Sequence, residues 1–226
     1  MNETITQILI IAPCLIIAIV FHEVAHGLAA LKLGDTTAKD LNRLSLNPLR
    51  HVDPVGTLLV PGALALAGAP VFGWAKPVPV RKDRLNNPRF GMMAVAAAGP
   101  ASNFVLALFG AIGLGLAAMM AGPVTGEEPT LIAQAMVFFI LINIFLGVFN
   151  LLPIPPFDGS HILEGLLPAS LAGLYAKLRP FGMMLFMGLV ALTWFAPELG
   201  VLGNTIGKPV EWVMQQYVAI AYAIAG

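Results

Sequence analysis

Long runs of apolar residues constrain the fold of this chain more than any other feature. A helix needs about 20 mostly apolar residues to cross the hydrocarbon core of a bilayer. The apolar segments that approach or exceed this length cover residues 5–31, 90–122, 130–152, 181–197 and 209–226. Charged residues make up only 11% of the chain, against about 25% in soluble domains. The sequence therefore predicts an all-α polytopic membrane protein with four to five transmembrane helices.

The chain is expected to form a single membrane-embedded domain over residues 1–226. Its core would cover about residues 5–165, followed by C-terminal helices over about residues 180–226. Cys14 is the only cysteine, which excludes a disulfide within the chain and a thiolate metal cluster.

The distribution of charge indicates which segments face the cytoplasm. Eleven of the 12 Lys and Arg residues lie in segments 32–50, 76–89 and 177–179, and Lys208 is the other one. By the positive-inside rule these three segments are cytoplasmic. The acidic residues expected on the opposite side are Glu3, Glu127, Glu128 and Glu198.

Residues 54–75 are apolar, but both of their ends are expected on the cytoplasmic side. They also contain several prolines and glycines, which interrupt a straight helix. We therefore expect a re-entrant, partly β element that lines a wet pocket, because irregular backbone at membrane depth needs protein or water beside it. Segments 54–62 and 70–80 are the candidates for an edge strand that could pair with an unwound substrate.

The run His22-Glu23-Val24-Ala25-His26 lies at the end of the first apolar segment. Two histidines four residues apart share one face of a helix, where both imidazoles can bind one zinc ion. The glutamate beside the first histidine can act as general base on a water molecule. The alternative is a pair of packed histidines with no metal. Polar groups at this depth are costly to bury, which favours a functional site.

A catalytic zinc site with two imidazoles needs a third protein ligand. The candidates in the sequence are Asp35, Asp40, His51, Asp53, Asp158 and His161. Asp35 and Asp40 lie in a polar, basic loop and are more simply solvated, whereas His51 and Asp53 remain open. Asp158 is favoured because it follows a proline-stiffened run in the same membrane zone as the two histidines. Its alternative role is to cap the helix that begins near residue 159.

Several motifs together resemble the site-2 protease family of intramembrane zinc metalloproteases. They are HEVAHG, NLLPIPPFDG, GWAKPVPV at 73–80, AGPASN at 98–103 and the segment 41–61. The similarity is to compact prokaryotic members without a PDZ or nucleotide-sensing domain. It implies one zinc ion held by His22, His26 and Asp158, with Glu23 as catalytic base, and a membrane-embedded sheet after the HExxH helix. Phe157 stands where leucine is commoner in the family.

Asparagines in the apolar segments are secondary candidates. Asn103 and Asn150 could hold the substrate backbone or a developing oxyanion. Hydrogen bonding between helices is the alternative for both, and the favoured role for Asn143. His161 is expected to be a supporting or surface group.

The predicted function is that of a zinc-dependent intramembrane endopeptidase that cuts within or near transmembrane segments. Its expected location is the cell (inner) membrane, with the active site toward the cytoplasm. The expected partners are a transmembrane-segment substrate and the lipid bilayer, and no nucleic acid. The alternatives are a metal transporter using the same ligands and a catalytically silent relative that binds membrane segments. Transport leaves Glu23 without a role.

Overall fold

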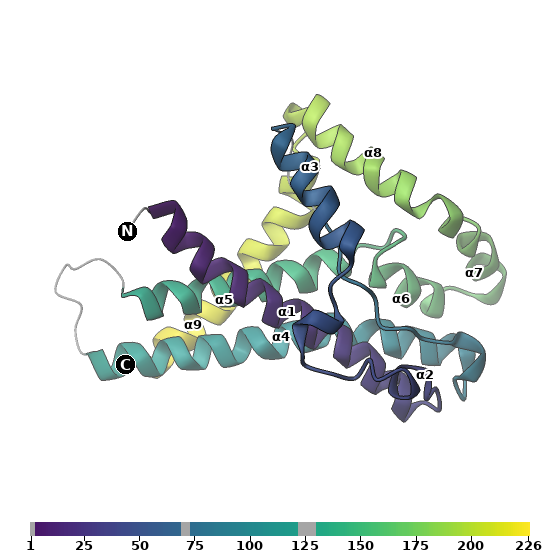
Figure 1. Cartoon of the computed structure of the whole chain (residues 1–226), viewed down its shortest axis with the longest axis horizontal. Helices are drawn as coiled ribbons and strands as arrows, with labels where there is room; N and C mark the ends of the chain where they lie inside the picture. Colours follow the sequence, from purple (N-terminus) through teal and green to yellow (C-terminus); the bar gives the residue numbers. More distant parts are fainter. Residues whose placement is uncertain (1–2, 69–72, 122–129) are drawn as a thin grey trace.

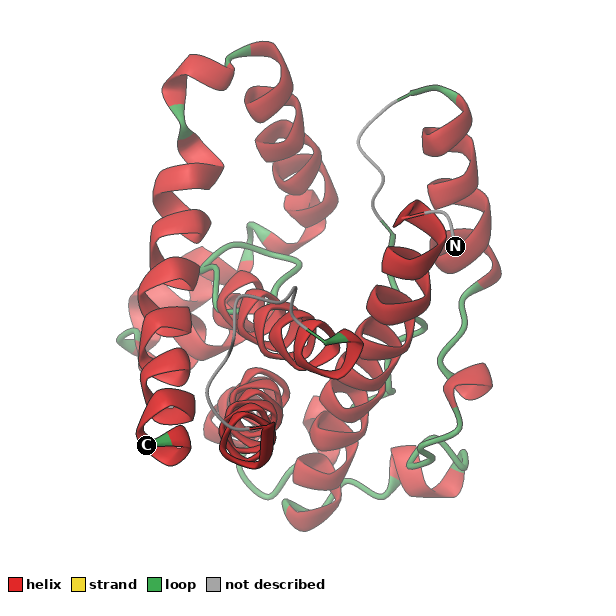
Figure 2. Ribbon diagram, turned by 90° about the vertical axis from the view of Figure 1, so that its left-hand side faces the viewer, coloured by secondary structure: helices red, strands yellow, loops and turns green. Residues whose placement is uncertain are grey.

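The computed structural model describes residues 3–68, 73–121 and 130–226. The described residues form helices joined by turns and loops, and they contain no strand (Figure 2). The α-helices are α1 (Glu3–Lys32), α2 (Thr37–Asp40), α3 (Val60–Leu66), α4 (Pro88–Ala121), α5 (Leu131–Asn150), α6 (Asp158–Leu166), α7 (Ala169–Ala176), α8 (Gly182–Phe195) and α9 (Lys208–Ala225). The short 3-10 and π elements are η1 (Pro48–Arg50), η2 (Pro54–Leu59), η3 (Lys82–Arg84), η4 (Arg179–Phe181), η5 (Pro197–Leu199) and η6 (Gly203–Gly207).

Four segments of the described chain are long and apolar enough to cross a membrane. They are Ile5–Lys32, Pro88–Met120, Leu131–Asn150 and Ala169–Thr193. This confirms the predicted polytopic membrane protein. Helix α9, expected as a fifth span, is not among the four, because Lys208, Glu211 and two glutamines lower its hydropathy. The fourth span begins earlier than expected because α7 is also apolar and only a short turn separates it from α8.

Helix α4 packs against α1, α5, α6 and α9 and runs along the lower edge of the molecule in Figure 1. Its small buried residues Ala107 and Ala111 contact Ile140 and Ile144 of α5, and Ile206 and Val210 complete this core. Small side chains let apolar helices approach closely, so that van der Waals packing can hold them together in lipid. Helices α3 and α8 extend away from this bundle (Figure 1).

The expected re-entrant, partly β element is not supported. Residues 54–66 are helical, as η2 followed by α3. Residues 73–81 form a loop without strand pairing, and residues 69–72 lie outside the described part of the chain. Pro77 and Pro79 have no backbone N–H, so this loop cannot form a regular ladder of β-sheet hydrogen bonds. The N–H of Val78, between them, donates to the Glu23 carboxylate 2.7 Å away.

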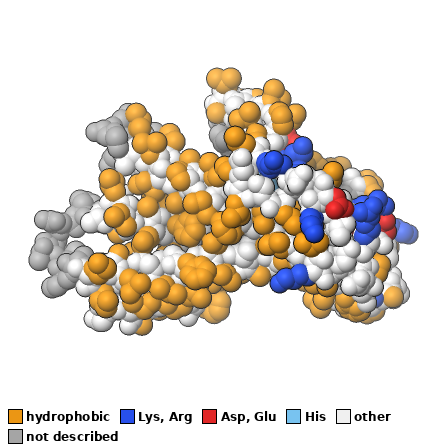
Figure 3. Space-filling view, turned by 60° about the horizontal axis from the view of Figure 1, so that its bottom comes forward, with side chains coloured by type: hydrophobic (Ala, Val, Ile, Leu, Met, Phe, Trp, Pro, Cys, Tyr) orange, Lys and Arg blue, Asp and Glu red, His pale blue; other side chains and the backbone are white. Residues whose placement is uncertain are grey.

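Lys and Arg side chains gather at one end of the molecule, over the region that holds α2 and η3 (Figure 3). Much of the remaining surface in the same view is apolar. Of the acidic residues expected at the opposite end, Glu127 and Glu128 lie outside the described residues.

Candidate metal centre

His22 and His26 lie on the same face of α1, one helical turn apart, and both are buried. Their rings meet edge to face with centroids 4.6 Å apart, and their Nε2 atoms are 3.0 Å apart. The helix brings the two atoms together because residues at i and i+4 lie one above the other.

Helix α4 determines which nitrogen of each imidazole carries the proton. The Nδ1 of His26 lies 2.7 Å from the carbonyl oxygen of Val95, and the Nδ1 of His22 lies 2.7 Å from the Oδ1 of Asn103. Both partners are hydrogen-bond acceptors, so each neutral imidazole donates from Nδ1. Each Nε2 then presents a lone pair to the other, and the short distance between them is not a hydrogen bond.

Asp158, the first residue of α6, completes the group. Its Oδ2 lies 3.1 Å from the Nε2 of His22 and 3.3 Å from the Nε2 of His26. The N-cap position of α6 belongs to Phe157, and no side chain caps the helix there. Gly159 lets the start of α6 approach the preceding loop, since a Cβ at this position would lie 2.2 Å from the Leu151 carbonyl oxygen.

The chemistry of this group fits a metal cation. Two imidazole lone pairs and a carboxylate oxygen face one another, and the buried Oδ2 of Asp158 has no hydrogen-bond donor among the described residues. The three ligand atoms all lie within 4.8 Å of one another. Ligand atoms of a tetrahedral zinc ion are about 3.3 Å apart, close to the separations observed. Within the described chain, no other group of His, Cys, Asp or Glu has this arrangement.

Glu23 lies beside these ligands on α1 and is half-buried. Its Oε2 accepts the backbone N–H of Val78, which holds the carboxylate against the loop that follows α3. The sequence motif identifies Glu23, but nothing in the sequence pattern points to the N–H that holds it.

The acidic candidates in the first polar loop are engaged elsewhere. Asp35 accepts hydrogen bonds from Thr37 and from the backbone N–H of Arg81, 2.6 Å away. Burial raises the pKa of Asp35, but these hydrogen bonds outweigh it and leave the pKa below its usual value. Asp40 accepts a hydrogen bond from Thr36. Both residues stabilise the loop.

The remaining candidates lie apart from the two histidines and make other contacts. The Nε2 of His51 lies 2.7 Å from the carbonyl oxygen of Ser45. Asp53 is the N-cap of η2 and accepts the backbone N–H groups of the first helical residues. The Nδ1 of His161 lies 2.8 Å from the guanidinium of Arg179. Asp158 is therefore the one candidate that the structure brings to the two histidines.

A charged cluster that the sequence analysis did not single out supports α6. Glu164 pairs with Arg179 and with the ammonium of Lys82, 3.0 Å away, and so links α6 to η4 and η3. Burial and the positive charge of Arg179 lower the pKa of His161 to about 4. This cluster braces the helix whose first residue is Asp158.

The three asparagines have different surroundings. Both amide hydrogens of Asn103 are used within the protein, which leaves the residue no free donor for an oxyanion. Asn143 is fully buried and donates to the carbonyl oxygen of Phe139. Asn150 donates to the carbonyl oxygen of Leu146 in its own helix and is only half-buried.

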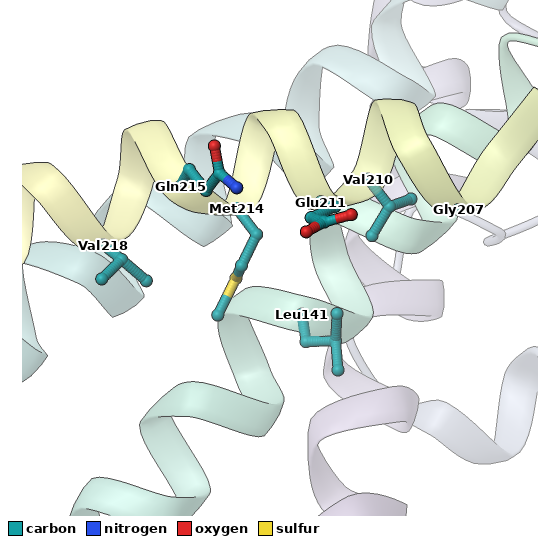
Figure 4. A pocket seen from close by; sticks show the side chains of 7 residues that line it. All are labelled: Leu141, Gly207, Val210, Glu211, Met214, Gln215 and Val218. Carbon is teal, nitrogen blue, oxygen red and sulfur yellow. The ribbon is translucent and has the colours of Figure 1, made fainter. Parts of the chain in front are cut away.

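A groove of about 440 Å³ lies between α5 and α9 (Figure 4). It is lined by Leu141, Gly207, Val210, Glu211, Met214, Gln215 and Val218. None of the clustered histidine and aspartate side chains lines it. The chemistry of the ligand cluster, and not the size of this groove, therefore locates the candidate site.

Comparison with known proteins identifies the family of the chain. The family model "Peptidase family M50" matches residues 116–193. YwhC of Bacillus subtilis, named as a candidate zinc metalloprotease, is 38% identical over 175 residues, which cover 77% of each chain. The chain belongs to peptidase family M50. A second relative, Rip2 of Mycolicibacterium smegmatis, is also named as a candidate zinc metalloprotease. It is 28% identical over 189 residues, 81% of this chain and 66% of Rip2.

Membership of the M50 family confirms the resemblance to site-2 proteases that the motifs indicated, and it implies zinc as the metal. No solved structure matches the chain.

Proposed function

We propose that this M50 protein is an intramembrane zinc endopeptidase that hydrolyses peptide bonds within or near transmembrane segments of membrane proteins. The observation that carries the proposal is the convergence of three lone-pair atoms from His22, His26 and Asp158, with Glu23 next in sequence to one of them. Family membership and the apolar helices support the same function.

We assign the metal to His22, His26 and Asp158. Zinc bound there would lower the pKa of a water molecule and polarise the scissile carbonyl. Glu23 would take a proton from the attacking water and deliver it to the leaving amine. Because the Oε2 of Glu23 accepts the N–H of Val78, we assign the proton transfer to Oε1.

We assign Asn150 to the oxyanion or the substrate backbone. Its side-chain nitrogen donates to Leu146, and an amide nitrogen has a second hydrogen to offer. Substitution Asn150→Ala should then lower kcat by about 100- to 1,000-fold without releasing zinc. Loss of zinc from this variant would contradict the assignment.

The decisive experiment compares the purified wild type with Glu23→Gln and Asp158→Ala in detergent. We expect the wild type and Glu23→Gln to bind zinc and only the wild type to cleave transmembrane peptides, whereas Asp158→Ala should lose zinc. Equal cleavage by Glu23→Gln would refute the general-base role. Zinc transport by wild-type protein in vesicles, without cleavage, would favour the transporter alternative.

We place the protein in the cell membrane with the metal centre toward the cytoplasm. The gathering of Lys and Arg side chains at one end supports this orientation (Figure 3). Leu49 lies in the basic segment and is 77% exposed. In a Cys14→Ala background, a Leu49→Cys variant in intact cells should resist a membrane-impermeant thiol reagent until the membrane is opened. Labelling in intact cells would reverse the assigned orientation.

A further inference from the structure

One face of α4 receives both imidazoles. Val95, Gly99 and Asn103 follow one another at intervals of four residues, so they line the same side of the helix. Val95 binds the Nδ1 of His26 through its backbone, and Asn103 binds the Nδ1 of His22 through its side chain. Because the Asn103 contact is made by a side chain, a substitution can remove it, whereas the Val95 contact is made by the backbone.

The amide of Asn103 is held in one orientation. It is fully buried, and its Nδ2 donates to the carbonyl oxygen of Ala18 at 3.1 Å and to the Oδ1 of Asn143 at 3.0 Å. A flipped amide would place Oδ1 against these two acceptors and Nδ2 against the Nδ1 of His22. The surroundings therefore fix Oδ1 toward His22.

Asn143 is in turn restrained by α5. It is fully buried, and its Nδ2 donates to the carbonyl oxygen of Phe139, 2.8 Å away. This leaves its Oδ1 to accept from Asn103. A continuous chain of hydrogen bonds thus runs from the backbone of α5 through Asn143 and Asn103 to His22 on α1.

We propose that Asn103, held by Asn143, is a positioning residue that fixes the tautomer and ring orientation of His22. With the proton fixed on Nδ1, the Nε2 lone pair of His22 is directed at the Oδ2 of Asp158. Partners of this kind typically change metal affinity by about 10- to 100-fold when they are removed. The inference rests on the proposed metal site and deepens it, since it makes zinc affinity depend on the packing of α4 and α5.

The test measures zinc affinity and the stability of the metal-free protein in the wild type and in matched variants. Asn103→Leu removes the acceptor with little change in size, and Asn103→Asp keeps an acceptor oxygen for His22. Asn143→Leu leaves the contact to His22 but removes its support. Ser102→Ala is the control, because Ser102 neighbours Asn103 on α4 and its hydroxyl donates to the Gly99 carbonyl oxygen of the same helix.

We expect Asn103→Leu to weaken zinc binding by about 10- to 100-fold, as measured by competition with a chelator of known affinity. Asn143→Leu should cause a smaller loss, and Ser102→Ala none. Asn103→Asp should bind zinc more tightly than Asn103→Leu. Without metal, Asn103→Asp should be less stable than Asn103→Leu, because Asn103→Asp buries a carboxylate and loses two donors.

This opposition separates positioning from simple packing. Wild-type zinc affinity in Asn103→Leu would overturn the inference alone and leave the metal site standing. Zinc affinities that merely follow metal-free stability would also overturn it. A wild-type protein that binds no zinc would overturn the metal site, and the inference with it.

Discussion

Gly99→Ala is predicted to disable the metal centre with a single methyl group. A Cβ at Gly99 would lie 2.5 Å from the Cε1 and Nε2 of His26 and 2.6 Å from the Cε1 of His22. Carbon atoms in contact lie about 3.5–4.0 Å apart, so the added methyl group overlaps each ring by about 1 Å. Neither ring can turn away freely, because α4 itself binds both Nδ1 atoms. The backbone of α4 must therefore move away from α1.

Movement of α4 would break the hydrogen bonds that hold both Nδ1 atoms, and the freed rings would leave the geometry of a zinc site, in which ligand distances are held to about 0.2 Å. We expect zinc affinity to fall by at least about tenfold and cleavage to fall with it. Overpacking should also lower the free energy of unfolding by about 1–3 kcal/mol. Zinc affinity is measured by chelator competition, cleavage with a transmembrane peptide, and stability by thermal unfolding in detergent.

Gly113→Ala is the matched control on the same helix. The nearest atom to a Cβ at Gly113 is the terminal Cε of Met136, at 3.2 Å, and a flexible methionine can adjust. Both substitutions raise helix propensity equally, by about 1 kcal/mol. Zinc affinity and cleavage should be unchanged in Gly113→Ala. If Gly99→Ala matched this control in zinc affinity, the imidazoles would not depend on the space at Gly99 and the reasoning would fail.

Three further predictions test other contacts around the site. Val78→Pro removes the N–H that binds Glu23 within a run already flanked by prolines, so kcat should fall by about tenfold with zinc retained. The control Val78→Ile keeps the N–H and should keep the rate, and equal rates for the two variants would contradict the role of that N–H. Burial and Arg179 lower the pKa of His161 from about 6.5 to about 4. At pH values between these two numbers, the unfolded state therefore binds more protons than the folded state. Stability should therefore fall by up to about 3 kcal/mol as pH drops from 6.5 to 4. In His161→Gln the unfolding temperature should lose this part of its pH dependence. An unchanged dependence of the unfolding temperature on pH would refute the role given to His161. Asp53→Ala should lower stability by about 1 kcal/mol through its lost N-cap and keep its zinc, whereas lost zinc would reopen Asp53 as a ligand.

The grouping of His22, His26 and Asp158 could be predicted from the sequence, because the signals came from local spacing and from the membrane topology. HExxH spacing puts His22 and His26 on one helical face whatever surrounds them. Asp158 followed from the positive-inside rule, which puts its loop in the same membrane zone as the end of the first apolar run. The long apolar runs likewise predicted the polytopic helical fold without any tertiary information, and the four candidate spans agree.

The environment of the candidate metal centre could not be predicted in the same way. The contact from Val95 uses a backbone carbonyl, and that from Val78 uses a backbone N–H, so neither leaves a signature in residue type. The predicted edge strand was wrong for the described residues, although the sequence did contain evidence against it. Pro77 and Pro79 remove two of the N–H groups that a ladder needs, and that argument should outweigh apolar composition.

The hydrogen-bond chain from Asn143 to His22 explains why buried amides are placed between apolar helices. Lipid is as apolar as leucine, so the bilayer gives no hydrophobic drive for helices to associate. Contacts between helices must then come from packing and from polar groups. Asn103 joins α1, α4 and α5 through its three partners, and one of these partners is the proposed zinc ligand His22. The same bonds therefore hold the helices together and orient the ligand. It follows that α1, α4 and α5 should stay joined in the metal-free protein, because none of the three hydrogen bonds of Asn103 needs the metal.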